Sequence, residues 1–228
     1  MLVIRSERVR RILRILLPFA IMPAIVLLLP LGIQSQYYAL VSFILVLLAL
    51  LLFLAGFERR ELGMRRMILV SAMTALSVLG RLLPLIKPIT ALTVLTAMYL
   101  GPESGFLVGA LSAVLSNFVM GQGPWTPFQM LAWGLIGLFA GILAKPLRRL
   151  PVLLYIYGML SGVAYSMLLD IWTTVWTYRE FTLHEYRAAI LSAVPLTCLY
   201  AFSNLLFLMI LRKPIGDKLS RIRKKYGL

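Results

Sequence analysis

The chain has 228 residues, of which 61% are hydrophobic and 14% charged, and its mean hydropathy is +0.92. Soluble domains are about 45–50% apolar and about 25% charged. A small globule could not bury so many apolar residues, so the composition excludes a soluble enzyme and a disordered chain. The net charge of +15 comes from 23 Lys+Arg against 8 Asp+Glu, and a single cysteine, Cys198, leaves no disulfide within the chain.

Continuous apolar runs, rather than alternating ones, predict an all-α polytopic membrane protein and exclude a transmembrane β-barrel. The predicted location is the cell membrane, with multiple passes. Eight runs are candidate spans, and the fourth and fifth are short and separated by a predicted tight turn at 101–105. The runs are 12–33, 36–57, 67–86, 88–101, 104–120, 127–147, 152–176 and 188–212.

Basic residues predict the orientation of these spans. With both termini in the cytoplasm, the inner segments 5–14, 59–66, 145–149 and 212–225 hold 19 of the 23 basic residues. The outer segments hold only Arg81, Lys87, Arg179 and Arg187. Loops on the cytoplasmic side carry an excess of Lys and Arg, so this distribution places both termini inside. The basic tail could also contact anionic lipid.

A charged stretch at 58–66 divides the chain into two predicted parts. Residues 1–66 form a two-span hairpin with its cytoplasmic linker, and residues 67–228 form a six-span core with the basic tail. An arginine-rich start before an apolar run is also typical of a signal peptide, but the run is long, no A-x-A site follows it and another span comes at once. The hairpin spans carry almost no polar residues, so the core is expected to hold the functional site.

Unusual polar and aromatic residues collect at the predicted outer ends of the core spans. An aspartate within a span costs roughly 2.5–3.5 kcal/mol on insertion scales, so Asp170 needs a partner, and we expect it to pair with Arg81 or to share a ligand with it. The string GQGPWTP at 121–127 combines glycines, stiffening prolines, an aromatic face and amides, which favours a ligand-binding loop. The candidate substrate-binding residues are Arg81, Lys87, Asn117, Gln122, Trp125, Gln129, Asp170, Trp172 and Thr173. A structural ion pair and a plain aromatic belt at the interface remain the alternatives.

Several chemistries lack their residues in this sequence. There is no G-x-x-x-x-G-K-[ST] string for binding ATP, no His/Cys/Asp cluster for a metal, and the only histidine, His184, lies in a predicted outer loop. We therefore expect no catalytic residue, no metal site and no cofactor bound by this chain. Proton- or sodium-coupled carriers hold ionisable groups near the midplane, whereas Arg81 and Asp170 are displaced outward. An outer binding site without an internal energy source predicts a partner that supplies the energy.

Three strings within 67–147 resemble one known family. They are KPITAL at 87–92, GPESGFLVGALSAVLSNF at 101–118 and GQGPWTPFQMLAWGLIG at 121–137. These strings are similar to the substrate-binding S components of energy-coupling factor (ECF) transporters. The third resembles a subgroup predicted to take up cobalamin, whose members also carry two extra N-terminal spans.

The resemblance implies a six-helix core, here 67–212, that binds a vitamin or a related micronutrient near the outer face. It also implies a membrane-embedded T component and two cytosolic ABC ATPases as partners, with ATP used by the ATPases and no nucleic acid involved. The family docks on its T component through an A-x-x-x-A pattern in the first core helix. Here Ser71 and Ala75, or Ala72 with Leu76, hold those positions, which departs from the pattern. The loop over the site in the family corresponds here to 82–90.

Other functions remain open on the sequence alone. Cobalamin is the first candidate substrate, while a queuosine precursor, a benzimidazole or another small cyclic nutrient would also suit aromatic rings flanked by amides. A membrane-embedded enzyme that modifies lipid would need an ionisable cluster at the interface, for which only Asp170, Arg81 and His184 are available. A membrane scaffold without transport is the third possibility.

Overall fold

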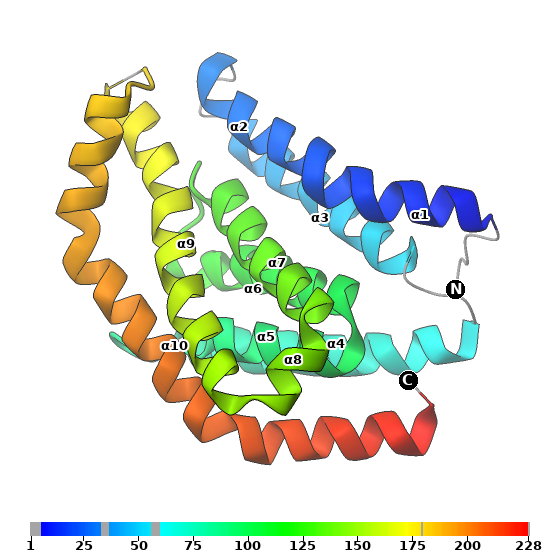
Figure 1. The fold of residues 1–228 in the computed structure, drawn as a ribbon. Helices are drawn as coiled ribbons and strands as arrows, with labels where there is room; N and C mark the ends of the chain where they lie inside the picture. The colour runs from blue at the N-terminus through cyan, green and yellow to red at the C-terminus, as the bar shows by residue number, and fades with distance from the viewer. Residues whose placement is uncertain (1–5, 33–36, 56–59, 179, 228) are drawn as a thin grey trace.

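The computed structural model describes residues 6–32, 37–55, 60–178 and 180–227, and all the regular elements in these ranges are helices (Figure 1). Four of them are long and apolar enough to cross a membrane. The predicted all-α polytopic class is therefore confirmed, whereas the number of spans and the side of each terminus stay predictions. The elements are α1 (Glu7–Leu16), the π-helical turn η1 (Leu17–Ile21), α2 (Met22–Gly32), α3 (Tyr38–Ala55), α4 (Arg60–Arg81), α5 (Ile89–Leu100), α6 (Pro102–Met120), α7 (Thr126–Ile142), α8 (Ala144–Arg149), α9 (Pro151–Tyr178) and α10 (Leu183–Tyr226).

The N-terminal hairpin consists of α1, η1 and α2 in one continuous run, followed by α3 (Figure 1). Pro18 lacks an N–H and cannot donate inside a helix, which accounts for the π-helical turn between α1 and α2. The hairpin packs on α6 and α7 of the core. Phe19 meets Phe139 edge-on with ring centroids 5.7 Å apart, and Arg14 Nε lies 2.9 Å from Glu103 Oε1. The hairpin is thus attached to the core by a ring contact and an ion pair.

Several predicted boundaries were wrong. The predicted turn at 101–105 is shorter, because the chain reverses at Gly101 alone (φ 103°) and α6 begins at Pro102. The predicted span 127–147 ends at Ile142 and is followed by the separate short helix α8. The last helix begins at Leu183 and continues to Tyr226, so most of the predicted basic tail is helical. The predicted ends at 33, 36 and 57 lie outside the described residues, as do Arg5, Arg59 and Arg179.

Close packing of α6 on α7 forms the centre of the core. A methyl group added at Gly105 would lie 2.9 Å from the carbonyl oxygen of Gly137, and one added at Gly109 would lie 2.9 Å from the amide nitrogen of Gly134. Gly162 is in similar contact with Ala201, which joins α9 to α10. Small residues let helix backbones approach closely in membranes. These small residues therefore pack helices against one another within the chain.

The two ends of the bundle differ in chemistry. One end, which we call the basic end, carries α8, the N-terminal part of α4 and the C-terminal part of α10, which turns beneath the core in Figure 1. There the Arg65 guanidinium lies 4.8 Å from the ring centroid of Tyr226, and that of Arg148 lies 5.9 Å from the ring of Tyr99. The opposite end, which we call the loop end, carries the α4–α5, α6–α7 and α9–α10 connections. The positive-inside rule predicts that the basic end faces the cytoplasm.

We expect Gly109→Ala to destabilise the protein. The added methyl group would press on the backbone of Trp133 and Gly134, and overpacking in a tight interior costs typically about 1–3 kcal/mol. Thermal unfolding of the purified protein in detergent should show a lower midpoint for this variant. Ala188→Val, at an exposed position of α10, is the control that should leave the midpoint unchanged. Equal midpoints for Gly109→Ala and wild type would contradict the packing described here.

Candidate functional site

A buried arginine occupies the loop end of the core. Arg81 is the last residue of α4 and only 6% exposed. Its Nη1 donates to Ser116 Oγ at 2.5 Å, to Asn117 Oδ1 at 2.8 Å and to the carbonyl oxygen of Ala113 at 3.3 Å. Its Nη2 donates to Gln129 Oε1 at 3.3 Å. Four neutral acceptors from α6 and α7 thus satisfy part of a guanidinium that carries five N–H donors.

Asn117 links this arginine to the α6–α7 loop. Its Nδ2 donates to Gln129 Oε1 and to Thr126 Oγ1, each at 2.8 Å. The Thr126 hydroxyl donates in turn to Gln122 Oε1 at 3.0 Å, and Gln122 Nε2 donates to the carbonyl oxygen of Val114 at 2.8 Å. The structure therefore brings Arg81, Asn117, Gln122 and Gln129 together, as four of the predicted site residues. Gln122 bonds inward to hold the loop.

An aromatic wall stands beside the arginine. The Arg81 guanidinium lies 4.8 Å from the ring centroid of Trp133, a distance at which cation–π attraction is substantial. Trp133 stacks on Tyr165 of α9 with centroids 4.5 Å apart, and Tyr165 meets Tyr200 of α10 edge-on at 5.3 Å. Three helices thus contribute one ring each to a continuous aromatic surface next to a positive charge.

A small cavity of about 30 Å³ lies between this wall and the α4–α5 loop. A volume of that size holds one or two water molecules. The residues around it come from the loop, α5, α7, α9 and α10. They are Leu85, Lys87, Ile89, Thr90, Trp133, Gly162, Tyr165, Tyr200, Ser203 and Asn204.

The α4–α5 loop closes over this cavity and is attached to α10. The backbone N–H of Lys87 donates to Ser203 Oγ at 2.8 Å, and the Ser203 hydroxyl is 3.1 Å from the Lys87 carbonyl oxygen. Leu85, the tip of the loop, is exposed and has a positive φ of 60°, which is uncommon for a leucine. Burial lowers the pKa of the Lys87 ammonium, and the positive charge of Arg81 lowers that pKa further. An anionic group between the two cations would offset both effects.

The expected Arg81–Asp170 ion pair is not formed. Among the ion pairs of the described residues, none joins these two side chains. Asp170 is buried on α9 and interacts electrostatically with Tyr186 and Tyr200 of α10, whereas Arg81 is occupied by amide and hydroxyl oxygens of α6 and α7. Different helices therefore surround the two charged groups. The Tyr200 side chain interacts electrostatically with both Arg81 and Asp170.

The predicted tryptophans form a second group at the loop end. Trp125 meets Trp172 edge-on at 5.6 Å, and Trp172 stacks on Trp176 at 5.7 Å. These rings are not among those that line the cavity. The ring of Trp125 folds back over Gly123, where any side chain would collide with it. Thr173 also lies on α9, and its hydroxyl donates to the carbonyl oxygen of Leu169 at 3.2 Å.

The residues that complete the cavity wall were not among those predicted from the sequence. Trp133 lies one helical turn after Gln129, and therefore on the same face of α7, which the periodicity could have indicated. Ser203 and Asn204 are two polar residues within an otherwise apolar run, a signal that was available and not used. Tyr165 and Tyr200 carried no such signal, because tyrosines in spans are also common as interfacial residues.

The predicted docking residues lie on one open face of α4. Ser71, Ala72 and Ala75 are exposed, while Val70 and Thr74 on the other side are buried. Large apolar side chains flank the small ones and are exposed as well. They are Ile68, Leu76 and Leu79. The face is apolar and has small residues at its centre, which permits the close approach of another helix in the membrane.

Comparison with known proteins identifies the class. Residues 61–221 match the family model described as "ECF-type riboflavin transporter, S component". The comparisons with curated proteins and with solved structures each found no match. The matched range covers more than half of the chain and includes nearly all of α4 to α10.

The chain belongs to this family of ECF S components. It is accordingly a membrane-embedded subunit that gives an ECF importer its substrate specificity, and it works with a T component and ATPases. S components are transporter subunits rather than enzymes, which argues against the lipid-modifying enzyme considered from the sequence. The cobalamin subgroup is not confirmed, since the family description names riboflavin.

We expect Asn117→Leu to destabilise the loop end. Leucine has a similar volume but would remove three buried hydrogen bonds, one donated to the Thr126 hydroxyl, one donated to Gln129 Oε1 and one accepted from Arg81. A buried hydrogen bond contributes about 0.5–1.5 kcal/mol net, and one to a charged group about 1.5–3 kcal/mol. The midpoint of thermal unfolding should fall, while Thr177→Val, an exposed isosteric change on α9, should leave it in place. A midpoint unaffected by Asn117→Leu would show that Asn117 does not hold this end together.

Proposed function

We propose that this chain captures a conjugated, ring-shaped micronutrient in the cavity beside Arg81 and delivers it inward when coupled to the T component and the ATPases. The single observation that carries the proposal is the buried Arg81 guanidinium. It faces a stacked aromatic wall and has only neutral hydrogen-bond partners among the described residues. A cation in a span without an anion beside it is energetically costly, so its presence there indicates a functional role.

The charge of the site supports a ligand that offers oxygen or nitrogen acceptors or an anionic group. Lys87 lines the cavity, and Arg81 lies behind the Trp133 ring that also lines it. The repulsion between the two cations falls when an acceptor-rich group enters near them. The rings of Trp133, Tyr165 and Tyr200 offer stacking surface for the flat part of the ligand. Aromatic rings with a few well-placed polar groups are typical of sites for small organic ligands.

The size of the closed cavity supports a moving loop. A volume of about 30 Å³ admits no vitamin, so the α4–α5 loop must separate from α10 before a ligand enters. The two hydrogen bonds between Lys87 and Ser203 and the positive φ of Leu85 fit a loop that opens at small energetic cost. Riboflavin, named by the family description, needs a modest opening, whereas cobalamin, the first candidate from the sequence, needs a much larger one.

The ligand is tested by calorimetry on the purified chain in lipid nanodiscs. The panel contains riboflavin, cobalamin, a 7-deazaguanine precursor of queuosine and benzimidazole. We expect one ring compound to bind, and Arg81→Met to weaken its binding by about 10- to 100-fold, as the loss of a hydrogen bond to a charged group implies. Lys87→Met, in a loop where misfolding is a smaller risk, should weaken binding in the same direction.

Arg187→Met is the matched control. It removes an exposed arginine at the loop end and should leave the affinity unchanged. If the ligand binds as tightly to Arg81→Met and Lys87→Met as to wild type, the site lies elsewhere. If none of the four compounds binds to a folded wild type, the proposed substrate class is wrong.

We further propose that the open face of α4 docks on the T component. Ser71 and Ala75 lie one turn apart on that face and let a neighbouring backbone approach, although serine replaces one of the two alanines of the family pattern. The hairpin packs on α6 and α7, so it leaves this face uncovered. Docking and ligand capture thus use separate surfaces of the core.

We expect Ala75→Trp to prevent co-purification of the T component and the ATPases while leaving ligand affinity unchanged. The indole would hold the two helices apart. Leu191→Trp, which places the same side chain at an exposed position of α10 outside this face, is the control that should leave assembly intact. Full assembly of Ala75→Trp with its partners would place the docking face on another helix.

A further inference from the structure

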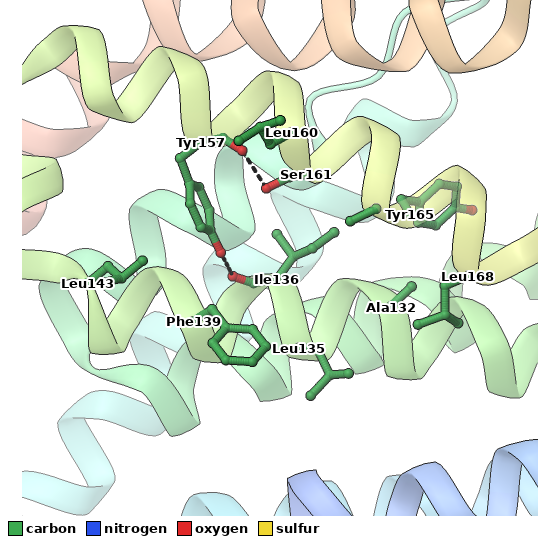
Figure 2. Close-up of a pocket in the computed structure, with 11 residues that line it drawn as sticks. Ala132, Leu135, Ile136, Phe139, Leu143, Tyr157, Leu160, Ser161, Tyr165 and Leu168 are labelled. Atoms are coloured by element: carbon green, nitrogen blue, oxygen red, sulfur yellow. Dashed lines mark hydrogen bonds between the residues drawn. The ribbon is translucent and has the colours of Figure 1, made fainter. Parts of the chain in front are cut away.

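A second cavity of about 420 Å³ lies between α7 and α9, on the side of the core that faces the hairpin (Figure 2). It is a lateral groove whose walls are almost entirely apolar. The α7 wall includes Leu135, Ile136 and Phe139, and the α9 wall includes Leu160 and Ala164. Figure 2 shows Tyr157 of α9 reaching across to Ile136 of α7, with Leu135 and Phe139 on the side of α7 turned toward the hairpin. We call this cavity the α7–α9 groove.

The polar side chains of the groove are directed to partners within the chain, and Tyr165 interacts with the Gln129 side chain. The Tyr157 hydroxyl donates to the carbonyl oxygen of Ile136 at 2.5 Å, and the Ser161 hydroxyl donates to that of Tyr157 at 2.7 Å. Both bonds are drawn in Figure 2. With its polar side chains satisfied internally, the groove suits a hydrocarbon chain. Of the two helices that form it, α9 is long and apolar enough to cross a membrane and α7 is a shorter apolar helix, so acyl chains are the expected surrounding medium.

The groove extends from Ala132 of α7 to Leu143, the residue directly after that helix, which is 11 steps along the chain. At a rise of about 1.5 Å per residue this is roughly 16 Å, about the depth of one leaflet. Leu143, at the basic end of the groove, is followed directly by α8, the helix that joins α7 to α9. A chain lying in the groove would therefore have its polar head beside α8.

α8 presents two unpaired cations to that head. Lys145 and Arg149 are four residues apart, so they share one face of the helix, and both are exposed. Arg148 points the other way, donating from Nε to the carbonyl oxygen of Ala144 at 3.2 Å and lying over Tyr99. Neither Lys145 nor Arg149 forms an ion pair within the described part of the chain. Basic side chains at the cytoplasmic surface attract anionic headgroups.

We propose that the α7–α9 groove binds an anionic phospholipid of the cytoplasmic leaflet, with one acyl chain between α7 and α9 and the phosphate at Lys145 and Arg149. The apolar walls select a hydrocarbon chain, and the two cations at its mouth select the negative headgroup. This site is separate from the micronutrient cavity, although Tyr165 borders both. Lipid bound in the groove would lie against the Tyr165 ring, which stacks on Trp133.

The test measures phospholipid bound to the full chain by native mass spectrometry in mild detergent. Palmitoyl-oleoyl phosphatidylglycerol and phosphatidylcholine, which share their acyl chains, are titrated separately. We expect phosphatidylglycerol to bind more tightly, and the double variant Lys145→Gln/Arg149→Gln to weaken it by at least about tenfold without affecting phosphatidylcholine. Ala164→Trp, which fills the groove, should weaken the binding of both lipids.

Two matched controls distinguish this site from general attraction. Lys218→Gln/Arg221→Gln removes two exposed cations from the C-terminal part of α10, and Leu115→Trp fills an apolar surface between α3 and α6. Neither should change the affinity for phosphatidylglycerol. The proposal is overturned if wild type binds the two lipids equally, if the α10 control weakens phosphatidylglycerol as much as the α8 variant, or if Ala164→Trp binds lipid like wild type. Loss of the T component from Ala164→Trp with lipid binding intact would assign the groove to that partner instead.

A negative result for lipid binding can be distinguished from a negative result for micronutrient binding. The lipid measurement needs no micronutrient, and none of the altered side chains belongs to the cavity beside Arg81. Calorimetry on Ala164→Trp with the micronutrient identified in the panel reports the first site independently. A variant that loses lipid and still binds its micronutrient supports both assignments.

Discussion

The loop end of the core is organised around the buried guanidinium of Arg81. A charged side chain in the bilayer is costly, and the usual solution is an opposite charge. Here the Arg81 side chain has amide, hydroxyl and carbonyl acceptors and the face of Trp133 instead. These partners satisfy its hydrogen bonds without cancelling its charge. The loop end of the core is therefore left with a positive potential that an incoming acceptor can use.

That arrangement requires α6 and α7 to lie unusually close together. Asn117 and Gln129 can exchange a hydrogen bond of 2.8 Å only because glycines lower down, such as Gly105 and Gly137, let the two backbones touch. The packing at the middle of the helices thus fixes the geometry of the polar groups at their ends. The close α6–α7 pair also gives the α4–α5 loop, which is proposed to open, a fixed wall beside it.

The sequence was sufficient for the helical class and for the polar half of the site. The sequence singled out Arg81, Asn117 and Gln129. A charge or an amide in an apolar span costs free energy, so such a residue usually has a structural or functional role. Asp170 stood out for the same reason, yet its expected partner was wrong, since depth in the membrane does not say which helices are neighbours. The aromatic residues of the site could not be predicted, because Tyr165 and Tyr200 resemble ordinary interfacial tyrosines until the packing of α9 on α10 is known. The end of α4 at Arg81 was placed too late, because apolar residues continue beyond it. The start of α6 at Pro102 was also placed too late, because the Gly-Pro pair was read as a turn although proline is well suited to the first position of a helix.

The hairpin can now be related to the remainder of the chain. It covers α6 and α7, the two helices that hold Arg81, and its Arg14 reaches Glu103 at the start of α6. This contact ties the hairpin to the close α6–α7 pair rather than to the loop that is proposed to open. The exposed face of α4 remains free of the hairpin, whereas α2 also contacts α9. An S component with such a hairpin therefore keeps its proposed docking face unobstructed, and the α7–α9 groove proposed for lipid lies beside the hairpin rather than beneath the docking face.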